Sequence, residues 1–228
     1  MTARSTGGGV LFDPPIYVNV RDRVTPLRAL VAWLERAGHQ RIVLLDNAST
    51  YEPCVEYLKA TPHDVVCLGA NLGSQALWRA GLQPNGWYVY TDPDVLPTPL
   101  CPLEAVAHLR DVLDRHSGYS KAGLGLYLDD VPETMPSLWW ERRLLTPHPD
   151  DSWPGELEPG VYGSLIDTTF ALYRPGMGFT YRAIRCGAPY QARHASWYVT
   201  EPGEEDRYYL DHALQGREAS SWATWPCA

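Results

Sequence analysis

Two aspartates one residue apart are the strongest candidates for chemistry in this chain of 228 residues. Asp92 and Asp94 form its only Asp-x-Asp, and they follow directly on the strand-like run at 87–90. Two carboxylates this close repel each other, and each resists removal from water. The pair therefore has a cation beside it, or it belongs to a solvated Asp-Pro-Asp turn.

Polar residues also follow the other strand-like runs in the first half of the chain. They are Arg21 and Asp22 after 16–20, Asp46 and Asn47 after 41–45, and Asn71 after 64–69. The carboxyl ends of parallel strands meet at one edge of a sheet, where ligands bind. We therefore expect these side chains to converge with Asp92 and Asp94. Carboxylates there would suit Mg²⁺ or Mn²⁺, which prefer oxygen ligands.

The elements that must position these residues alternate regularly. Strand patterns at 16–20, 41–47, 64–69 and 86–92 are separated by helix patterns at 25–38, 52–60 and 74–82. Thr25 is a candidate N-cap, and Gly38 a C-terminal stop, for the first helix. This rhythm predicts an α/β fold with right-handed crossovers and a mostly parallel sheet that has helices on both faces.

The second half is less regular. We expect a helix at 102–116, a strand at 121–130 that ends in Asp129 and Asp130, and one strand at 164–175. Residues 132–160 read as a loop or lid with a short helix at 138–145, and the aromatic-rich C-terminal part is expected to close over the sheet edge. The predicted organisation is a flexible tail at 1–15 and a single domain at 16–228. Its halves are 16–100 and 101–228.

Charge and composition narrow the function classes. The net charge is −8 and no basic run exceeds two residues, so nucleic acid is not an expected partner. Five cysteines without a C-x-x-C pair predict free thiols in a reducing cytoplasm. No apolar run reaches the roughly 18 residues of a transmembrane helix, and the first residues lack the apolar core of a secretory signal. We therefore expect a cytoplasmic protein.

Four segments together resemble a known family. VNVRDRVTPLRALVAWLERAG, IVLLDNAST, LGANLGSQALWRAG and YVYTDPDVLP are similar to the nucleotide-binding half of GT-A-fold glycosyltransferases, especially family 2-like enzymes. The resemblance covers roughly residues 16–100, and DNAS and the Asp-x-Asp are its specific parts. It implies that 16–100 is the nucleotide-binding half and 101–228 the acceptor and catalytic half. GLYLDDVP, IDTTFALYRP and RHASWY look like a smaller bacterial subgroup, and the Glu-Asp pair that usually opens a late helix is not evident.

The resemblance implies a GT-A-like, mixed and mostly parallel sheet and a metal-dependent glycosyltransferase. Such an enzyme moves a sugar from a nucleoside diphosphate sugar, here expected to be a UDP-sugar, to a hydroxyl of a glycan or small-molecule acceptor. A divalent cation, Mn²⁺ or Mg²⁺, neutralises the leaving diphosphate. This function is compatible with a homo-oligomer.

The resemblance also implies roles for individual residues. Asp92 would lie near the ribose and the metal, Asp94 would be the firmer metal ligand, and His194 a third ligand. Asp46 would accept a hydrogen bond from the base, or else serve only an N-cap or turn. Supporting contacts to the nucleotide sugar are expected from Asn47, Asn71 and Arg21, where Arg21 would pair with phosphate or with Asp46.

Two carboxylates compete for the catalytic base, which an inverting enzyme needs to take the proton of the acceptor hydroxyl. We favour Asp167 for this role and Asp130 for a contact to the donor sugar. Aromatic residues are candidates for stacking on an acceptor ring, or else they pack in the core: Trp139, Trp140, Trp197 and Tyr198.

Two other functions remain open from the sequence. A sugar nucleotidyltransferase shares the sheet and the carboxylate-bound Mg²⁺, but it normally carries a Gly-rich basic loop after the first strand, which NVRDRVTP is not. A non-catalytic nucleotide-sugar or glycan-binding protein would keep Asp46 and the aromatic residues without needing Asp94. Neither a Rossmann glycine fingerprint nor a P-loop motif occurs.

Overall fold

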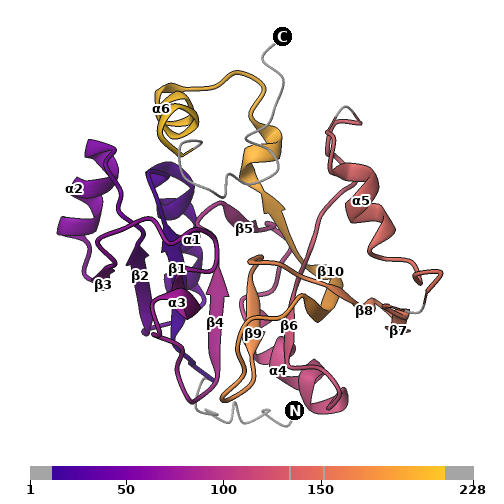
Figure 1. The fold of residues 1–228 in the computed structure, drawn as a ribbon. Helices are drawn as coiled ribbons and strands as arrows, with labels where there is room; N and C mark the ends of the chain where they lie inside the picture. The colour runs from indigo at the N-terminus through magenta and orange to yellow at the C-terminus, as the bar shows by residue number, and fades with distance from the viewer. Residues whose placement is uncertain (1–11, 134, 151, 214–228) are drawn as a thin grey trace, which may run out of the picture.

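The computed structural model of the chain describes residues 12–133, 135–150 and 152–213. Within them, ten strands form one sheet in the order β3-β2-β1-β4-β9-β6-β10-β8-β7, and β5 pairs with β10 (Figure 1). The sheet therefore runs without a break through both predicted halves of the chain.

The first half forms the predicted elements. The alternating run is β1 (Ile16–Val20), α1 (Val24–Arg36), β2 (Ile42–Asp46), α2 (Glu52–Ala60), β3 (Asp64–Cys67), α3 (Ala76–Arg79) and β4 (Tyr88–Thr91). β1 is parallel to β2 and β4, and β2 is parallel to β3. The chain adds β2 and β3 on one side of β1 and β4 on the other, so the order of strands reverses between β1 and β4. Such a reversal is where open α/β sheets bind ligands.

The second half makes the sheet mixed. Its elements are β5 (Val95–Pro97), α4 (Ala105–Arg115), β6 (Lys121–Leu126), α5 (Leu138–Arg143), β7 (Gly155–Glu158), β8 (Val161–Leu165), β9 (Ala171–Tyr173), β10 (Arg182–His194), a 3₁₀ turn η1 (Ala195–Tyr198) and α6 (Glu204–Ala213). β9 is antiparallel to both β4 and β6, and β10 is parallel to β6. The described sheet is therefore mixed. It is mostly parallel in strand direction, as predicted, because only β5, β8 and β9 run opposite to the other described strands.

Two predictions for the second half are wrong. The single strand expected at 164–175 is two strands, β8 and β9, separated by a turn at 166–170. The C-terminal segment from 189, expected to close over the sheet edge, begins instead as the end of β10, which lies inside the sheet between β6 and β8. β10 contains Gly187 and Pro189, and its register against β6 shifts between Cys186 and Gln191. Because of this irregularity, β10 lacks the alternation of apolar and polar residues by which a strand is recognised in a sequence.

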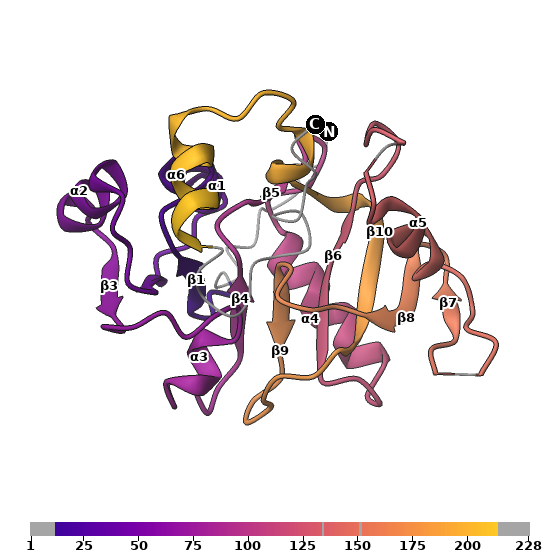
Figure 2. The same ribbon diagram turned by 45° about the horizontal axis from the view of Figure 1, so that its top comes forward.

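Helices cover both faces of the sheet. Leu27, Leu30 and Leu34 of α1 share a buried cluster with Leu109 of α4 on one face. Leu77 of α3 packs in a second cluster, with tyrosines from β4 and β9. In Figure 2, α6 lies beside α1. The predicted α/β layering is confirmed.

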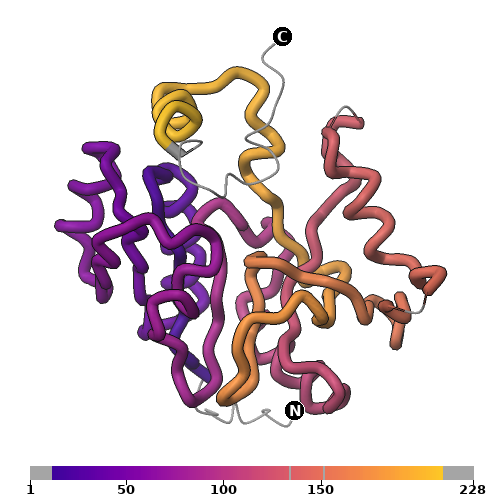
Figure 3. The backbone as a smooth tube through the Cα atoms, viewed as in Figure 1, coloured from indigo at the N-terminus to yellow at the C-terminus, as the bar shows by residue number. Residues whose placement is uncertain are grey.

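The last helix returns to the first half of the chain. After β10 the chain passes over the carboxyl ends of the strands and reaches α6 beside α1 (Figure 3). There the Glu205 carboxylate accepts hydrogen bonds from the Thr25 backbone N–H and from its hydroxyl, at 3.0 and 2.9 Å. Thr25 is therefore not the N-cap that we predicted. α1 begins at Val24, and Glu205 from α6 satisfies one of its free N–H groups.

Other predictions concern the ends and the cysteines. Residues 1–11 of the predicted tail, and Cys227, lie outside the described residues. Pro14 and Pro15 are buried, and Asp13 pairs with His39 at 3.0 Å, so 12–15 pack against the domain. The four described cysteines are free. No helix in the described parts of the chain is long and apolar enough to cross a membrane.

Candidate active site

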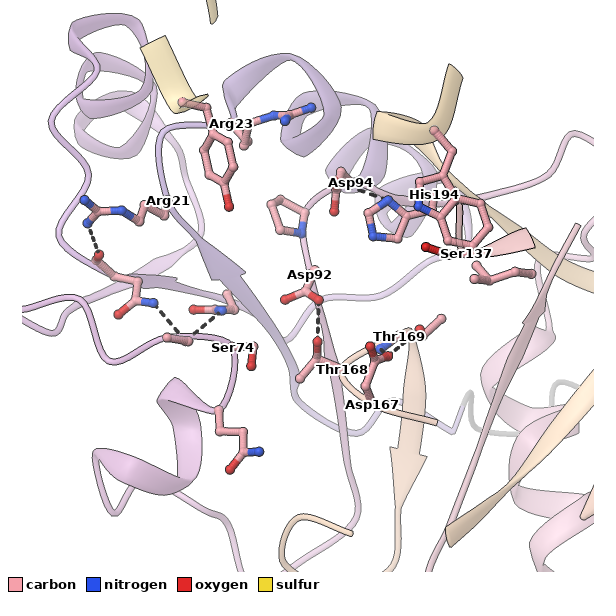
Figure 4. Close-up of a pocket in the computed structure, with 18 of the residues that line it drawn as sticks. Arg21, Arg23, Ser74, Asp92, Asp94, Ser137, Asp167, Thr168, Thr169 and His194 are labelled. Atoms are coloured by element: carbon pink, nitrogen blue, oxygen red, sulfur yellow. Dashed lines mark hydrogen bonds and ion pairs between the residues drawn. The ribbon is translucent and has the colours of Figure 1, made fainter. Parts of the chain in front are cut away.

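A cavity of about 520 Å³ opens at the carboxyl ends of β1 and β4, where the strand order reverses. Figure 4 shows Arg21 and Arg23 on one side of it, Asp167 and His194 on the other, and Asp92 and Asp94 between them. Its other lining residues are Asn19, Asn47, Asn71, Gly73, Ser74, Gln75, Pro93, Leu126, Ser137, Trp140, Glu141, Thr168, Thr169, Phe179, Tyr181, Trp197 and Tyr209. The predicted convergence of strand-end residues is therefore largely present.

The Asp-x-Asp segment links β4 to β10. Residues 92–94 join β4 to β5, and β5 pairs with the end of β10, where Val95 lies opposite His194. The Ala195 backbone N–H donates to the Asp94 carbonyl at 2.7 Å. The Ser196 hydroxyl donates to the Asp94 carboxylate, and His194 Nδ1 lies 3.6 Å from it. Asp94 is thus buried and held by the far half of the chain.

The two carboxylates of the pair have different environments. Burial, followed by the charge of Asp94, raises the pKa of Asp92 well above its ordinary value, although the Thr168 hydroxyl donates to its carboxylate. Burial acts in the same direction on Asp94. Its pKa is nevertheless lowered, because His194, Arg23 and Ser196 favour the charged form. A positive charge added to the cavity would stabilise the ionised form of Asp92.

Asp167 comes from the turn between β8 and β9 and is open to the cavity. Its Oδ1 accepts hydrogen bonds from the Thr169 hydroxyl at 2.9 Å and from the Thr169 backbone N–H at 3.2 Å. Crowding by the surrounding protein would raise its pKa. Arg185 and these hydrogen bonds outweigh that effect, so the pKa of Asp167 is lowered. Asp167 is therefore a carboxylate at neutral pH.

The loop before α3 borders the cavity and is held down by two asparagines. Asn47 is buried, donates to the Gly73 carbonyl at 3.0 Å and accepts from the Leu72 N–H at 2.6 Å. Asn19 donates to the same carbonyl at 3.3 Å. Asn71 accepts from the Gly73 N–H at 2.9 Å. Asn47 and Asn71 thus shape the cavity wall from where the sequence placed them.

Arg21 lies across the cavity from Asp167 and is fixed by backbone oxygens. Its Nη1 donates to the carbonyls of Asn47 and Ala48, both at 2.9 Å. Within the described residues, the buried Nε of Arg21 has no hydrogen-bond partner. It lies 3.9 Å from a carboxylate oxygen of Asp22. Arg21 does not pair with Asp46, which was one of its two predicted partners.

Two predicted site residues do not line the cavity. The Asp46 carboxylate accepts a hydrogen bond from the Ser49 backbone N–H at 2.8 Å, which is the turn role that competed with base recognition. Asp130 is exposed, pairs with Arg193 and accepts a hydrogen bond from the Tyr198 hydroxyl at 2.8 Å. The structure therefore brings neither of them to Asp92, Asp94 and Asp167.

Two of the predicted aromatic residues, Trp140 and Trp197, line the cavity. Trp139 is 67% exposed and does not line the cavity, whereas Trp140 does. Trp197 is buried, lines the cavity and stacks on His194 with ring centroids 5.3 Å apart.

Several cavity residues were missed by the sequence analysis. Arg23 is buried beside Glu205 and Asp206 of α6, at 3.7 and 3.4 Å. Glu141 of α5 forms a 2.6 Å ion pair with Arg185 of β10. Arg23 stands two residues after Arg21 in VRDR, and this spacing is the sequence feature that could have indicated a second arginine at the cavity. The ion pair between Glu141 and Arg185 joins residues 44 positions apart, so no local sequence pattern predicts it.

The donor set fits a divalent cation only in part. Asp92, Asp94 and His194 share the cavity, but no group of three His, Cys, Asp or Glu side chains in the described residues converges closely enough to hold a metal ion. Burial and the charge of Asp94 raise the pKa of Asp92, so a cation at the pair would favour its ionised form. One or two carboxylates together with substrate phosphates are what Mg²⁺ uses in proteins. The site fits an ion completed by the substrate.

Comparisons with known proteins give one fold-level likeness to report. No protein-family model matches the chain, and no curated protein sequence matches it. Among solved structures, it is similar to glucosyl-3-phosphoglycerate synthase from Mycobacterium tuberculosis, solved in complex with phosphoglyceric acid. The identity is 18% and the TM-score 0.44, over 71% of this chain and 56% of that chain. The match thus spans little more than half of the length of that protein.

Proposed function

We propose that this chain is a glycosyltransferase that moves a sugar from a nucleoside diphosphate sugar to an acceptor hydroxyl. The observation that carries the proposal is the arrangement of Asp92 and Asp94 at the end of β4, with Arg21 across the cavity on one side and Asp167 on the other. This arrangement puts an arginine side, which suits an anion, and the Asp167 carboxylate in one cavity. The sequence resemblance to GT-A enzymes agrees with this reading, and uridine is proposed as the nucleoside on that resemblance alone.

The diphosphate is placed on the side of β1. Arg21 and Arg23 both line the cavity on that side. Hydrogen bonds between guanidinium and phosphate are among the stronger ones in proteins because both partners are charged. An acidic protein thereby binds an anionic donor through local positive groups rather than through its net charge of −8.

Asp92 and Asp94 are the residues that would hold a divalent cation, with His194 beside Asp94. Such an ion supplies Lewis-acid stabilisation of the leaving diphosphate. The protein's part is orientation: Ser196 and the Ala195 backbone fix Asp94, while Thr168 fixes Asp92. The two carboxylates therefore face the cavity before any ligand arrives.

Asp167 is proposed as the base. The acceptor oxygen forms its bond to the anomeric carbon as the bond from that carbon to the diphosphate oxygen breaks. The hydroxyl proton passes to an Asp167 carboxylate oxygen. Its lowered pKa keeps it ready to accept that proton at neutral pH. Thr169 occupies Oδ1, which leaves Oδ2 for the acceptor.

Release of nucleoside diphosphate tests this function. The purified chain is incubated with a panel of nucleoside diphosphate sugars, with Mn²⁺ or with EDTA, and nucleoside diphosphate is measured. Metal-dependent release from one sugar nucleotide is the expected result, and Asp130→Asn, outside the cavity, is the control that keeps it. Pyrophosphate formed from a sugar phosphate and a nucleoside triphosphate would instead identify a nucleotidyltransferase. Binding without turnover would identify a binding protein.

A further inference from the structure

Lys121 is a fully buried lysine at the start of β6, in the middle of the sheet. It is one of only two lysines in the chain, and the other, Lys59, is exposed on α2. Removing an ammonium group from water costs far more free energy than burying an apolar side chain of the same length. A lysine at this position therefore needs a reason beyond filling space.

The side-chain nitrogen of Lys121 forms hydrogen bonds with three oxygens. Nζ donates to the carbonyl of Ile166 at 2.7 Å, to the carbonyl of Asp167 at 2.9 Å and to the Tyr173 hydroxyl at 3.1 Å. An ammonium has three N–H donors, so each oxygen receives one. A neutral amine would donate to the two carbonyls and accept from the Tyr173 hydroxyl, so both protonation states keep all three contacts.

These carbonyls belong to the turn that presents Asp167 to the cavity. The preceding carbonyl, that of Leu165, accepts a hydrogen bond from Arg185 Nε at 2.6 Å. Three consecutive carbonyls, from residues 165 to 167, are thus held by two buried cations that lie on neighbouring strands, β6 and β10. The backbone on the inner side of Asp167 is fixed, while its side chain stays open to the cavity.

The charged groups around Lys121 come from two elements. Asp167 lies in the turn and Arg185 on β10, while the rings of Tyr173 and Phe179 lie 5.1 and 5.0 Å from Nζ. Burial, with the Arg185 charge, lowers the pKa of Lys121 to about 7, although Asp167 acts in the opposite direction. The faces of aromatic rings stabilise a cation at this distance.

We propose that Lys121 is a positioning residue, which holds the 166–167 backbone so that the Asp167 carboxylate meets the acceptor hydroxyl. This proposal rests on the function proposed above. Lys121 touches neither the cavity nor, by its side chain, the Asp167 carboxylate, so it acts through the backbone. Losing it should slow the chemical step and leave donor binding unchanged, because the donor is placed on the other side of the cavity.

The test combines Lys121→Met with Asp167→Asn and measures nucleoside diphosphate release. Asp167→Asn is expected to lower kcat by about 100-fold or more. Lys121→Met should lower it by on the order of 10- to 100-fold, as expected for a misplaced catalytic group, with KM for the donor within about twofold. In the double variant the lysine change should add less than about threefold, because it has no base left to position. Lys59→Met is the matched control.

A second readout does not depend on turnover. Hydrogen–deuterium exchange of the peptide at 164–170 should rise in Lys121→Met and stay unchanged in Lys59→Met. The proposal would be overturned if the losses in kcat of the two single variants multiplied in full in the double variant. Unchanged hydrogen–deuterium exchange at 164–170 in Lys121→Met would also overturn it. If Lys121→Met does not fold, Lys121→Gln takes its place, and failure of both would assign the lysine to the fold and overturn it as well. No release by the unmodified chain, with increased exchange in Lys121→Met, would defeat the proposed function and not the anchoring of the turn.

Discussion

His194 Nδ1 lies 3.6 Å from the Asp94 carboxylate, which joins the end of β10 to the segment that follows β4 (Figure 4). The residues are exactly 100 positions apart in the chain, yet the pairing of β5 with β10 fixes their distance. Asp94 is therefore oriented by the C-terminal half of the sheet and faces a cavity that both halves of the chain line.

Asp94→Asn should abolish most metal-dependent turnover. The amide keeps the size of the side chain and can accept from Ser196, but it lacks the charge that attracts a cation. We expect kcat to fall by about 100-fold or more, which is roughly 3 kcal/mol of transition-state stabilisation. Steady-state release of nucleoside diphosphate measures it. Asp46→Asn, at the end of a neighbouring strand but outside the cavity, should stay within about threefold, and equal losses in both variants would refute the assignment.

Arg23→Gln should weaken nucleoside diphosphate binding by about 10-fold or more, because a charge-assisted hydrogen bond to phosphate is lost. Titration calorimetry with UDP and Mn²⁺ measures the affinity. Arg207→Gln, on the exposed part of α6, is the matched control. Arg23 also pairs with Glu205, so Glu205→Gln separates the two roles. If Glu205→Gln weakens binding as much as Arg23→Gln does, Arg23 acts by holding α6 and not by binding phosphate.

Gly123→Ala should destabilise the domain, because the turn that carries Asp167 packs on this glycine. A Cβ at Gly123 would lie 2.5 Å from the Phe170 carbonyl oxygen and 2.9 Å from Ile166 Cδ1. We expect a loss of about 2 kcal/mol in the free energy of unfolding, typical of overpacking, measured by chemical denaturation. Gly118→Ala, which meets nothing within 4 Å, is the control. Equal stability of the two variants would show that the turn does not pack as described.

The buried lysine should leave a signature in the pH dependence of stability. Its pKa is about 7 in the folded chain and near 10.4 when unfolded, so between these values the unfolded chain binds one proton more. The free energy of unfolding therefore rises with pH across this window, by about 1.4 kcal/mol per unit, and this contribution is lost as the pH falls to 7. Buried thiols act in the opposite direction, because burial raises the pKa of Cys54 to about 11.

Comparison with Lys121→Met removes the contributions of those thiols. The unmodified chain should gain about 2 to 3 kcal/mol relative to the variant between pH 7.5 and 9.5. Urea unfolding at several pH values gives the difference. Parallel pH profiles for the two proteins would mean that the lysine titrates normally and is not buried as described.

The first half of the fold was readable from the sequence because each strand there is a short apolar run with a helix after it. β2, for example, is IVLLD, a pattern typical of a strand buried on both faces. The sequence also placed Asp92, Asp94, Asn47 and Arg21 correctly at the strand ends, because parallel topology brings those ends together.

The second half was less predictable because its order depends on distant contacts. The run 164–175 looks like one strand, but Lys121 and Arg185 hold the carbonyls of its middle and make a turn there. Asp130 follows a strand as Asp92 does, yet Arg193 from β10 pairs with it away from the cavity. Without knowing that β10 lies inside the sheet, neither outcome could be derived from local patterns.

The most direct test of the central claim is a crystal structure with UDP and Mn²⁺. Our account predicts an anomalous manganese peak in contact with a carboxylate of Asp92 or Asp94, with the UDP diphosphate completing its coordination beside Arg21. UDP bound elsewhere on the molecule, or UDP in this cavity with Mn²⁺ present but no metal at the two aspartates, would contradict it.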